Sequence, residues 1–162
     1  MKTKKRQPTI IAKQFEQWLN EATCEFDTAV TLTFRNDPET IENACKQLTY
    51  FLNKLNDACF RNNWSRRSKH DPSARVAVIP VIENGFGRKR LHYHCIFARP
   101  AHIKSNMFQL LIDLCWDEAR NGGGTKNDVQ HVYDRLGFAG YMTKELRVND
   151  FDKLDEKNTH IY

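Results

Sequence analysis

Two histidines with one residue between them are the first candidates for chemistry in this chain. His92 and His94 lie within residues 91–98, a run rich in β-formers that predicts a strand. Side chains alternate faces along a strand, so both imidazoles point the same way and can chelate one divalent ion. A pair of exposed surface histidines is the alternative, because so short a motif often occurs by chance. The other face of the strand is apolar and is expected to pack against helices; it consists of Leu91, Tyr93, Cys95 and Phe97.

Glu83 is the candidate third ligand. Residues 75–83 also predict a strand, and a hairpin that pairs Asn84 with Leu91 puts Glu83 directly opposite His92, with Cβ atoms ~5 Å apart. A tighter turn over residues 84–87 would instead pair Glu83 with Arg88 and leave it in a surface ion pair. Two histidines and a glutamate do not define a reaction, because such a set can hold zinc for hydrolysis or iron for oxygenation.

A tyrosine and a lysine downstream form a second candidate group. Tyr141 and Lys144 are three residues apart on one side of a helix expected over residues 136–146. A lysine beside a phenol favours the phenolate and can hold a phosphate oxygen. Gly137 and Gly140, just before the tyrosine, would let a large substrate approach closely. The alternative is a tyrosine packed in the core beside a solvated lysine.

This ordered set resembles the HUH-superfamily replication initiators, the rolling-circle Rep endonucleases of small replicons. Leu91-His92-Tyr93-His94-Cys95 is similar to the family's His-hydrophobic-His metal motif, and Tyr141 with Lys144 to its Tyr-x-x-Lys nucleophile motif. Glu83 stands where many members carry a third ligand. Thr31-Leu32-Thr33-Phe34 is similar to the first strand motif, although it would not be recognised alone.

The order of the motifs indicates which branch of the superfamily the chain resembles. The histidine pair precedes the tyrosine, as in Rep proteins, whereas related relaxases carry the tyrosine first. Positions one turn from the tyrosine hold Gly137 and Glu145 rather than a second tyrosine, so the resemblance implies a single-tyrosine enzyme.

The resemblance implies metal-dependent, site-specific nicking and joining of single-stranded DNA through a 5′-phosphotyrosine intermediate. Such an enzyme initiates rolling-circle replication of a plasmid, phage or mobile element, with Mg²⁺ or Mn²⁺ as the expected ion. Expected partners are single-stranded DNA or an origin hairpin and a host helicase, with the protein a monomer or weak dimer. A single-tyrosine transposase, a non-catalytic origin-binding protein and a small-molecule metal hydrolase or oxygenase remain alternatives.

Two basic segments are candidates for DNA binding. One is Arg88-Lys89-Arg90, on the hairpin turn beside the predicted metal ligands. The other is a polar loop expected over residues 62–74, in which an aromatic side chain stands among cations: Arg61, Trp64, Arg66, Arg67, Lys69 and Arg75. Solvated charge runs are the alternative for both segments.

The elements that must position these groups alternate along the chain. Hydrophobic spacing predicts four helices and four strands, hence an α+β fold, in which a central antiparallel sheet is flanked by helices as in Rep catalytic domains. Asn36-Asp37-Pro38-Glu39 is expected to cap the second helix, with Pro38 in its first turn, and Pro80 predicts an edge or bulge. The predicted helices span residues 9–22, 41–62, 103–121 and 136–146, and the strands 29–34, 75–83, 91–98 and 129–133.

Length, charge and cysteine usage indicate the number of domains, the kind of partner and the cellular setting to expect. The 162 residues fit one domain over residues 1–148, with a basic arm over 1–8 and a charged tail over 149–162 that is expected to fray. A net charge of +5 favours an anionic partner. No apolar run approaches ~20 residues, so no membrane partner is expected. The five cysteines form no Cys-x-x-Cys pair, which disfavours a thiolate zinc site and favours a reducing, cytoplasmic setting.

Overall fold

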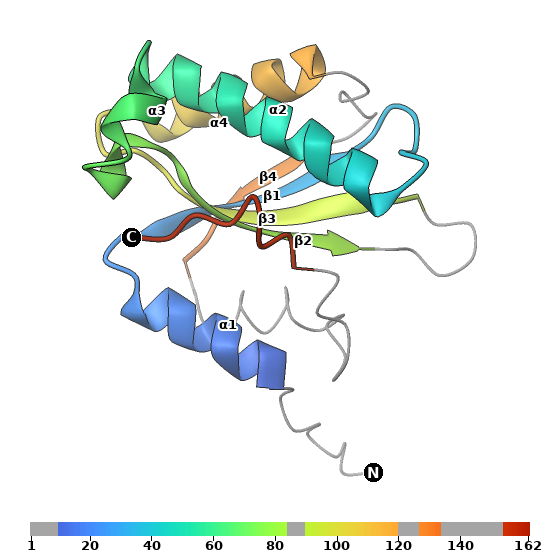
Figure 1. Cartoon of the computed structure of the whole chain (residues 1–162), viewed down its shortest axis with the longest axis horizontal. Helices are drawn as coiled ribbons and strands as arrows, with labels where there is room; N and C mark the ends of the chain where they lie inside the picture. Colours follow the sequence, from blue (N-terminus) through green and yellow to red (C-terminus); the bar gives the residue numbers. More distant parts are fainter. Residues whose placement is uncertain (1–9, 84–89, 120–126, 134–153) are drawn as a thin grey trace.

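The computed structural model describes residues 10–83, 90–119, 127–133 and 154–162. Over these residues the chain forms an antiparallel four-stranded sheet with helices on both faces (Figure 1). The strand order is β2-β3-β1-β4, and the strands are β1 (Phe26–Thr33), β2 (Ala77–Glu83), β3 (His92–Ala98) and β4 (Asp128–His131). The predicted α+β class and the antiparallel sheet with flanking helices are confirmed.

The helices divide between the two faces of the sheet. Helices α2 (Ile41–Phe60) and α4 (Ser105–Glu118) cover one face, and α1 (Ile10–Glu21) covers the other (Figure 1). Each face has its own hydrophobic core. The core under α2 and α4 includes Leu32, Tyr93, Phe97, Phe108 and Trp116, and the core under α1 includes Phe15, Leu19, Ile79, Val81 and Ile96.

The two faces of strand β3 differ, as its alternating sequence predicts: one face packs in the core and the other carries the two histidines. Tyr93, Cys95 and Phe97 are fully buried in the core under α2 and α4. His92 and His94 point to the opposite face, at the end of the sheet beyond the α1 core.

Two local predictions are wrong. The N-cap of α2 is Thr40, whose Oγ1 accepts a hydrogen bond from the Asn43 N–H at 3.1 Å, so Pro38 lies in the preceding loop and not in the first turn. Residues 62–74 are not all loop, because they contain α3 (Trp64–Arg67) and a 3₁₀ turn (Pro72–Ala74). Asn63 takes the left-handed conformation at φ 73°, which asparagine tolerates, and this turns the chain from α2 into α3.

The C-terminal residues 154–162 do not fray, contrary to expectation. Their backbone pairs with the outer edge of β2: Val78 and His160 exchange both N–H···O bonds, at 2.8 and 2.9 Å. Pro80 has no N–H to offer on this edge, yet its carbonyl accepts the Asp155 N–H at 3.1 Å. The predicted edge position of Pro80 is thereby confirmed, and the pairing satisfies backbone groups that an open edge would leave unpaired.

The same segment is tied to the sheet by buried side chains. Asp155 is 6 % exposed, and its Oδ2 accepts the Tyr93 hydroxyl at 3.0 Å and an Asn158 amide N–H at 2.6 Å. Tyr93 lies between the two histidines in sequence, so the hydrogen bond from Tyr93 to Asp155 links the C-terminal segment to the strand that carries them. In the described part of the chain, no helix has the length and apolar character that a membrane crossing needs.

Candidate metal centre

The β2–β3 hairpin brings the three predicted ligands together. In the register of the two strands Glu83 pairs with His92 and Val81 with His94. This confirms the hairpin pairing inferred from the sequence and excludes the tighter turn, in which Glu83 would pair with Arg88. Because directly paired residues share a face of the sheet, all three ligand side chains project on the same side.

The ligand atoms converge on one point. Glu83 Oε2 lies 2.8 Å from His92 Nε2 and 2.7 Å from His94 Nε2, and the two Nε2 atoms are 3.1 Å apart. The side chains are 17 %, 20 % and 14 % exposed for Glu83, His92 and His94. The group is thus shielded on most sides and still open to an incoming ion.

The opposite nitrogen of each imidazole is held by a hydrogen-bond partner. His92 Nδ1 lies 3.1 Å from the Arg90 carbonyl oxygen, which can only accept, so this nitrogen carries the proton. His94 Nδ1 lies 3.2 Å from Thr31 Oγ1, which can accept in the same way. Protonation at Nδ1 leaves a lone pair on each Nε2, and both lone pairs face the Glu83 carboxylate. Three electron-rich atoms this close repel one another unless a metal ion or a proton lies between them.

The spacing also bears on coordination geometry. Ligands about 2.1 Å from an ion lie about 3.0 Å apart when they subtend a right angle and about 3.4 Å apart at the tetrahedral angle. The observed separations of 2.7–3.1 Å are short enough for all three atoms to bind one ion. Such a group can hold a metal ion, and three protein ligands leave positions open for water or substrate.

Glu83 has the charge that a ligand requires. Burial by itself would raise the pKa of this carboxyl, but when no metal ion is bound and the imidazoles are protonated, hydrogen bonds and positive charge from His94 and His92 outweigh burial and lower the pKa below its usual range. The carboxylate is therefore ionised at neutral pH.

Two supporting contacts were not predicted from the sequence. Thr31 lies opposite His94 in the β1–β3 pairing, and the Arg90 carbonyl holds His92. The C-terminal end of β1 is fixed in turn by α4, since the Trp116 indole N–H donates to the Thr33 carbonyl at 2.8 Å. The alternation of Thr31 and Thr33 was visible in the sequence, but their pairing with a strand some sixty residues away was not.

The other predicted site residues divide into two groups. Tyr141, Lys144, Arg88 and Lys89 lie outside the described residues. Arg90 is described, and its side chain is exposed.

Three residues of the predicted basic loop, Trp64, Arg66 and Arg67, lie on helix α3. The Trp64 indole N–H donates to Asp57 Oδ1 at 2.6 Å, and Arg67 donates to the Phe60 carbonyl at 2.7 Å. The Arg66 side chain is exposed. Trp64 and Arg67 therefore also hold α3 against the end of α2.

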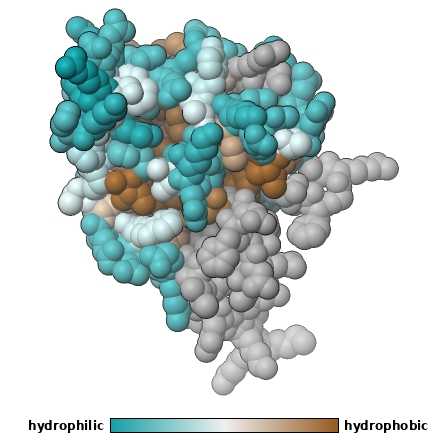
Figure 2. Space-filling model, viewed as in Figure 1, coloured by the Kyte–Doolittle hydropathy of each residue, from teal (hydrophilic) through white to brown (hydrophobic). Residues whose placement is uncertain are grey.

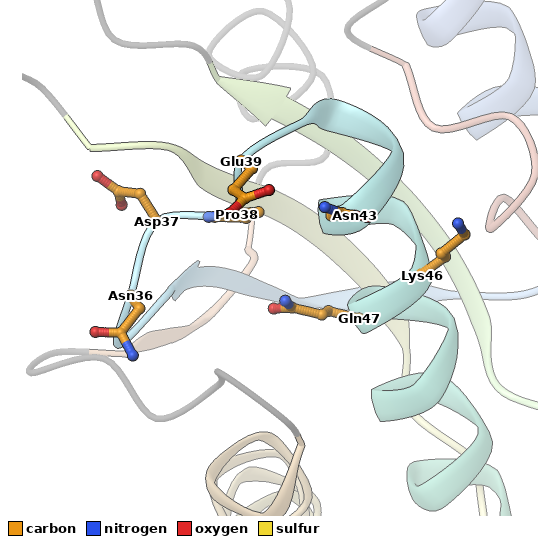
Figure 3. A pocket seen from close by; sticks show the side chains of 7 residues that line it. All are labelled: Asn36, Asp37, Pro38, Glu39, Asn43, Lys46 and Gln47. Carbon is orange, nitrogen blue, oxygen red and sulfur yellow. The ribbon is translucent and has the colours of Figure 1, made fainter.

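A polar hollow lies where β1 leads into α2 (Figure 3). The Gln47 side chain reaches from α2 toward the loop, and its buried Oε1 has no hydrogen-bond partner. The hollow contains the carboxylates of Asp37 and Glu39, and Lys46, the cation among its described lining residues, pairs with Glu42 at 2.7 Å. This charge balance disfavours phosphate, so the hollow is a poor match for a nucleic-acid contact.

Comparison of the chain with protein-family models, curated proteins and solved structures finds no match.

Proposed function

We propose that this protein nicks and rejoins single-stranded DNA with the help of a divalent ion, as the HUH-superfamily replication initiators that its sequence resembles do. The observation that carries the proposal is the convergence of Glu83, His92 and His94 on one point from a β-hairpin. The sequence resemblance names these three residues as ligands. The basic run Arg88-Lys89-Arg90, which follows β2, adds charge suited to a DNA backbone.

Glu83, His92 and His94 would hold the ion, and Mg²⁺ or Mn²⁺ suits the coordination of a phosphate. Two imidazole ligands favour Mn²⁺ over Mg²⁺, which prefers oxygen. When bound, the ion supplies positive charge that polarises the scissile phosphate and stabilises charge in the transition state.

Tyr141 is the proposed nucleophile, on the evidence of the sequence motif. Its phenolic oxygen attacks the phosphorus, the bond from phosphorus to the 3′ oxygen breaks, and the 5′ phosphate becomes esterified to the tyrosine. The phenol loses its proton and the departing 3′ oxygen gains one, so the step is balanced and needs no ATP. Lys144 would stabilise the phenolate or orient the phosphate.

The test is the covalent adduct. The protein is incubated with labelled single-stranded oligonucleotides and Mn²⁺, and a labelled band that survives SDS is expected, with the label on the Tyr141 peptide by mass spectrometry. Tyr141→Phe should abolish the adduct, whereas Tyr133→Phe, at a tyrosine 91 % exposed, should retain it. No adduct with a broad oligonucleotide pool, or full cleavage by Tyr141→Phe, would refute the proposed mechanism.

The metal requirement has its own control. His94→Ala or EDTA should stop cleavage, whereas His70→Ala, at an exposed histidine away from the cluster, should not. Undiminished cleavage in EDTA would rule out a role for the ion.

The combination of two histidines and a carboxylate also favours a second candidate function. Non-haem iron oxygenases use such a triad, so a small-molecule oxygenase shares this geometry. Substrate-dependent oxygen consumption with Fe²⁺, together with indifference to oligonucleotides, would support this candidate over a nuclease.

A further inference from the structure

A second polar pocket lies between α2, α3 and the C-terminal turn. It is distant from the candidate metal ligands Glu83, His92 and His94, called the metal cluster below. Among the residues that the structure describes, three cations line the pocket and no carboxylate does. Figure 2 shows hydrophilic side chains over this part of the molecule, where α3 lies in Figure 1. The residues whose side chains matter here are Trp64, Ser65, Lys69, Arg75 and Lys157.

Arg75 is the centre of the pocket's chemistry. Its guanidinium carbon lies 5.9 Å from the centre of the Trp64 ring, and its buried Nε has no hydrogen-bond partner. Burial lowers the pKa of Arg75, and no acid offsets that effect. A half-buried, unpaired guanidinium is costly for a protein to keep and is relieved by an anion.

The two lysines form no ion pair with the described residues, although the Lys157 charge contributes to lowering the pKa of Glu42, which itself pairs with Lys46. Among the ion pairs of the described residues, none involves Lys69, Arg75 or Lys157. Two neighbouring carboxylates are already engaged: Asp57 accepts the Trp64 indole N–H, and Asp71 accepts from the backbone and hydroxyl of Ser73. The described lining of the pocket therefore carries an excess of positive charge.

We propose that this pocket binds a backbone phosphate of single-stranded nucleic acid. The planar guanidinium, two ammonium groups and the Ser65 hydroxyl offer donors to a multiply charged oxyanion. The exposed Arg66 on α3 extends the charge beyond the pocket, as suits a continuing strand rather than an isolated phosphate.

The pocket and the metal cluster lie at opposite ends of β2. Arg75 precedes the strand and Glu83 ends it, eight residues later, which corresponds to about 26 Å along an extended chain. The pocket would hold a strand at a distance from the cluster and so retain it independently of cleavage. Single-stranded nucleic acid as the ligand rests on the proposed function, whereas the anion site itself does not.

The test is equilibrium binding of a fluorescent oligo-dT to the full-length protein in EDTA, followed by anisotropy between about 50 and 200 mM NaCl. A single strand contributes about 0.7 to the salt slope for each neutralised phosphate, so loss of the one phosphate contact in Lys69→Gln/Lys157→Gln should lower the slope by about 0.7 and weaken binding about fivefold at about 0.1 M salt. Arg75→Gln should also weaken binding. The matched control, Lys13→Gln on α1, removes one exposed charge and should change affinity less than twofold.

The outcomes separate the possible ligands. An unchanged slope and affinity in the double variant, with an unchanged thermal melt, would overturn the inference. Inorganic phosphate or dTMP binding as tightly as the oligonucleotide would overturn the strand assignment, as would equal affinity for duplex DNA. Because EDTA removes the cluster's ion, loss of binding in the double variant supports the pocket even if the protein forms no adduct with DNA.

Discussion

Thr31 gives the most direct test of how the metal cluster is held. Its hydroxyl lies 3.2 Å from His94 Nδ1, and Thr31→Val removes this hydrogen bond while keeping the shape and β-propensity of the side chain. Loss of a hydrogen bond that orients a metal ligand costs about 10- to 100-fold in metal affinity. A separation of 3.2 Å is at the long end of the normal range, so we expect about tenfold, or about 1.4 kcal/mol.

The assay is a Mn²⁺ titration followed by calorimetry at fixed pH. The matched control is Thr33→Val, two residues along the same strand and opposite His92. His92 is oriented by the Arg90 backbone carbonyl, which this substitution leaves in place, so its affinity should stay within twofold of wild type. An affinity for Thr31→Val equal to wild type, or an equal loss in both variants, would refute the assigned role of Thr31.

Three further predictions concern stability and reactivity. Tyr93→Phe should lower the free energy of unfolding in urea by about 1.5–3 kcal/mol, because the hydroxyl donates to the buried Asp155 carboxylate; a loss below about 0.5 kcal/mol would contradict this. Burial lowers the pKa of His160 and outweighs the hydrogen bond to the Pro72 carbonyl, with the Arg75 charge adding to the lowering. Stability from neutral His160 should be complete above pH ~6.5 and fall as the pH drops below that value, and His160→Gln should flatten the profile. Burial raises the pKa of the Cys59 thiol to about 12, so Cys59 should resist alkylation at pH ~8 until the protein unfolds, as peptide mapping would show.

Local sequence patterns were sufficient for the elements that depend on near neighbours. The apolar–polar alternation around Tyr93 predicted which face of β3 packs, because side-chain period along a strand is fixed by backbone geometry. The Glu83–His92 register was one of two that the sequence allowed, and the structure confirms it over the tighter turn. The metal cluster could therefore be predicted because all three ligands lie on one hairpin.

Predictions failed where a local signal competed with another signal or with tertiary packing. Pro38 and Glu39 resemble a helix start, but the Thr40 hydroxyl caps α2 because it is positioned to accept the Asn43 N–H. The tail was expected to fray because its composition is charged, yet Asp155 is buried through hydrogen bonds to Tyr93 and Asn158. Composition alone could not reveal partners more than sixty residues away.

The sequence by itself determined that His92 and His94 share one face of a strand and that Glu83 lies on the same hairpin, whereas the register that brings Glu83 opposite His92 came from the structure. The tertiary structure decided what supports that set: Thr31 from β1 behind His94, and a C-terminal segment that pairs with β2 and braces Tyr93. It also decided that Arg75 and Lys157, eighty-two residues apart, line one pocket whose described residues include no carboxylate. The physical reason is the separation along the chain. Backbone geometry relates residues that are close in sequence, whereas contacts between distant segments depend on the packing of the whole sheet and its helices.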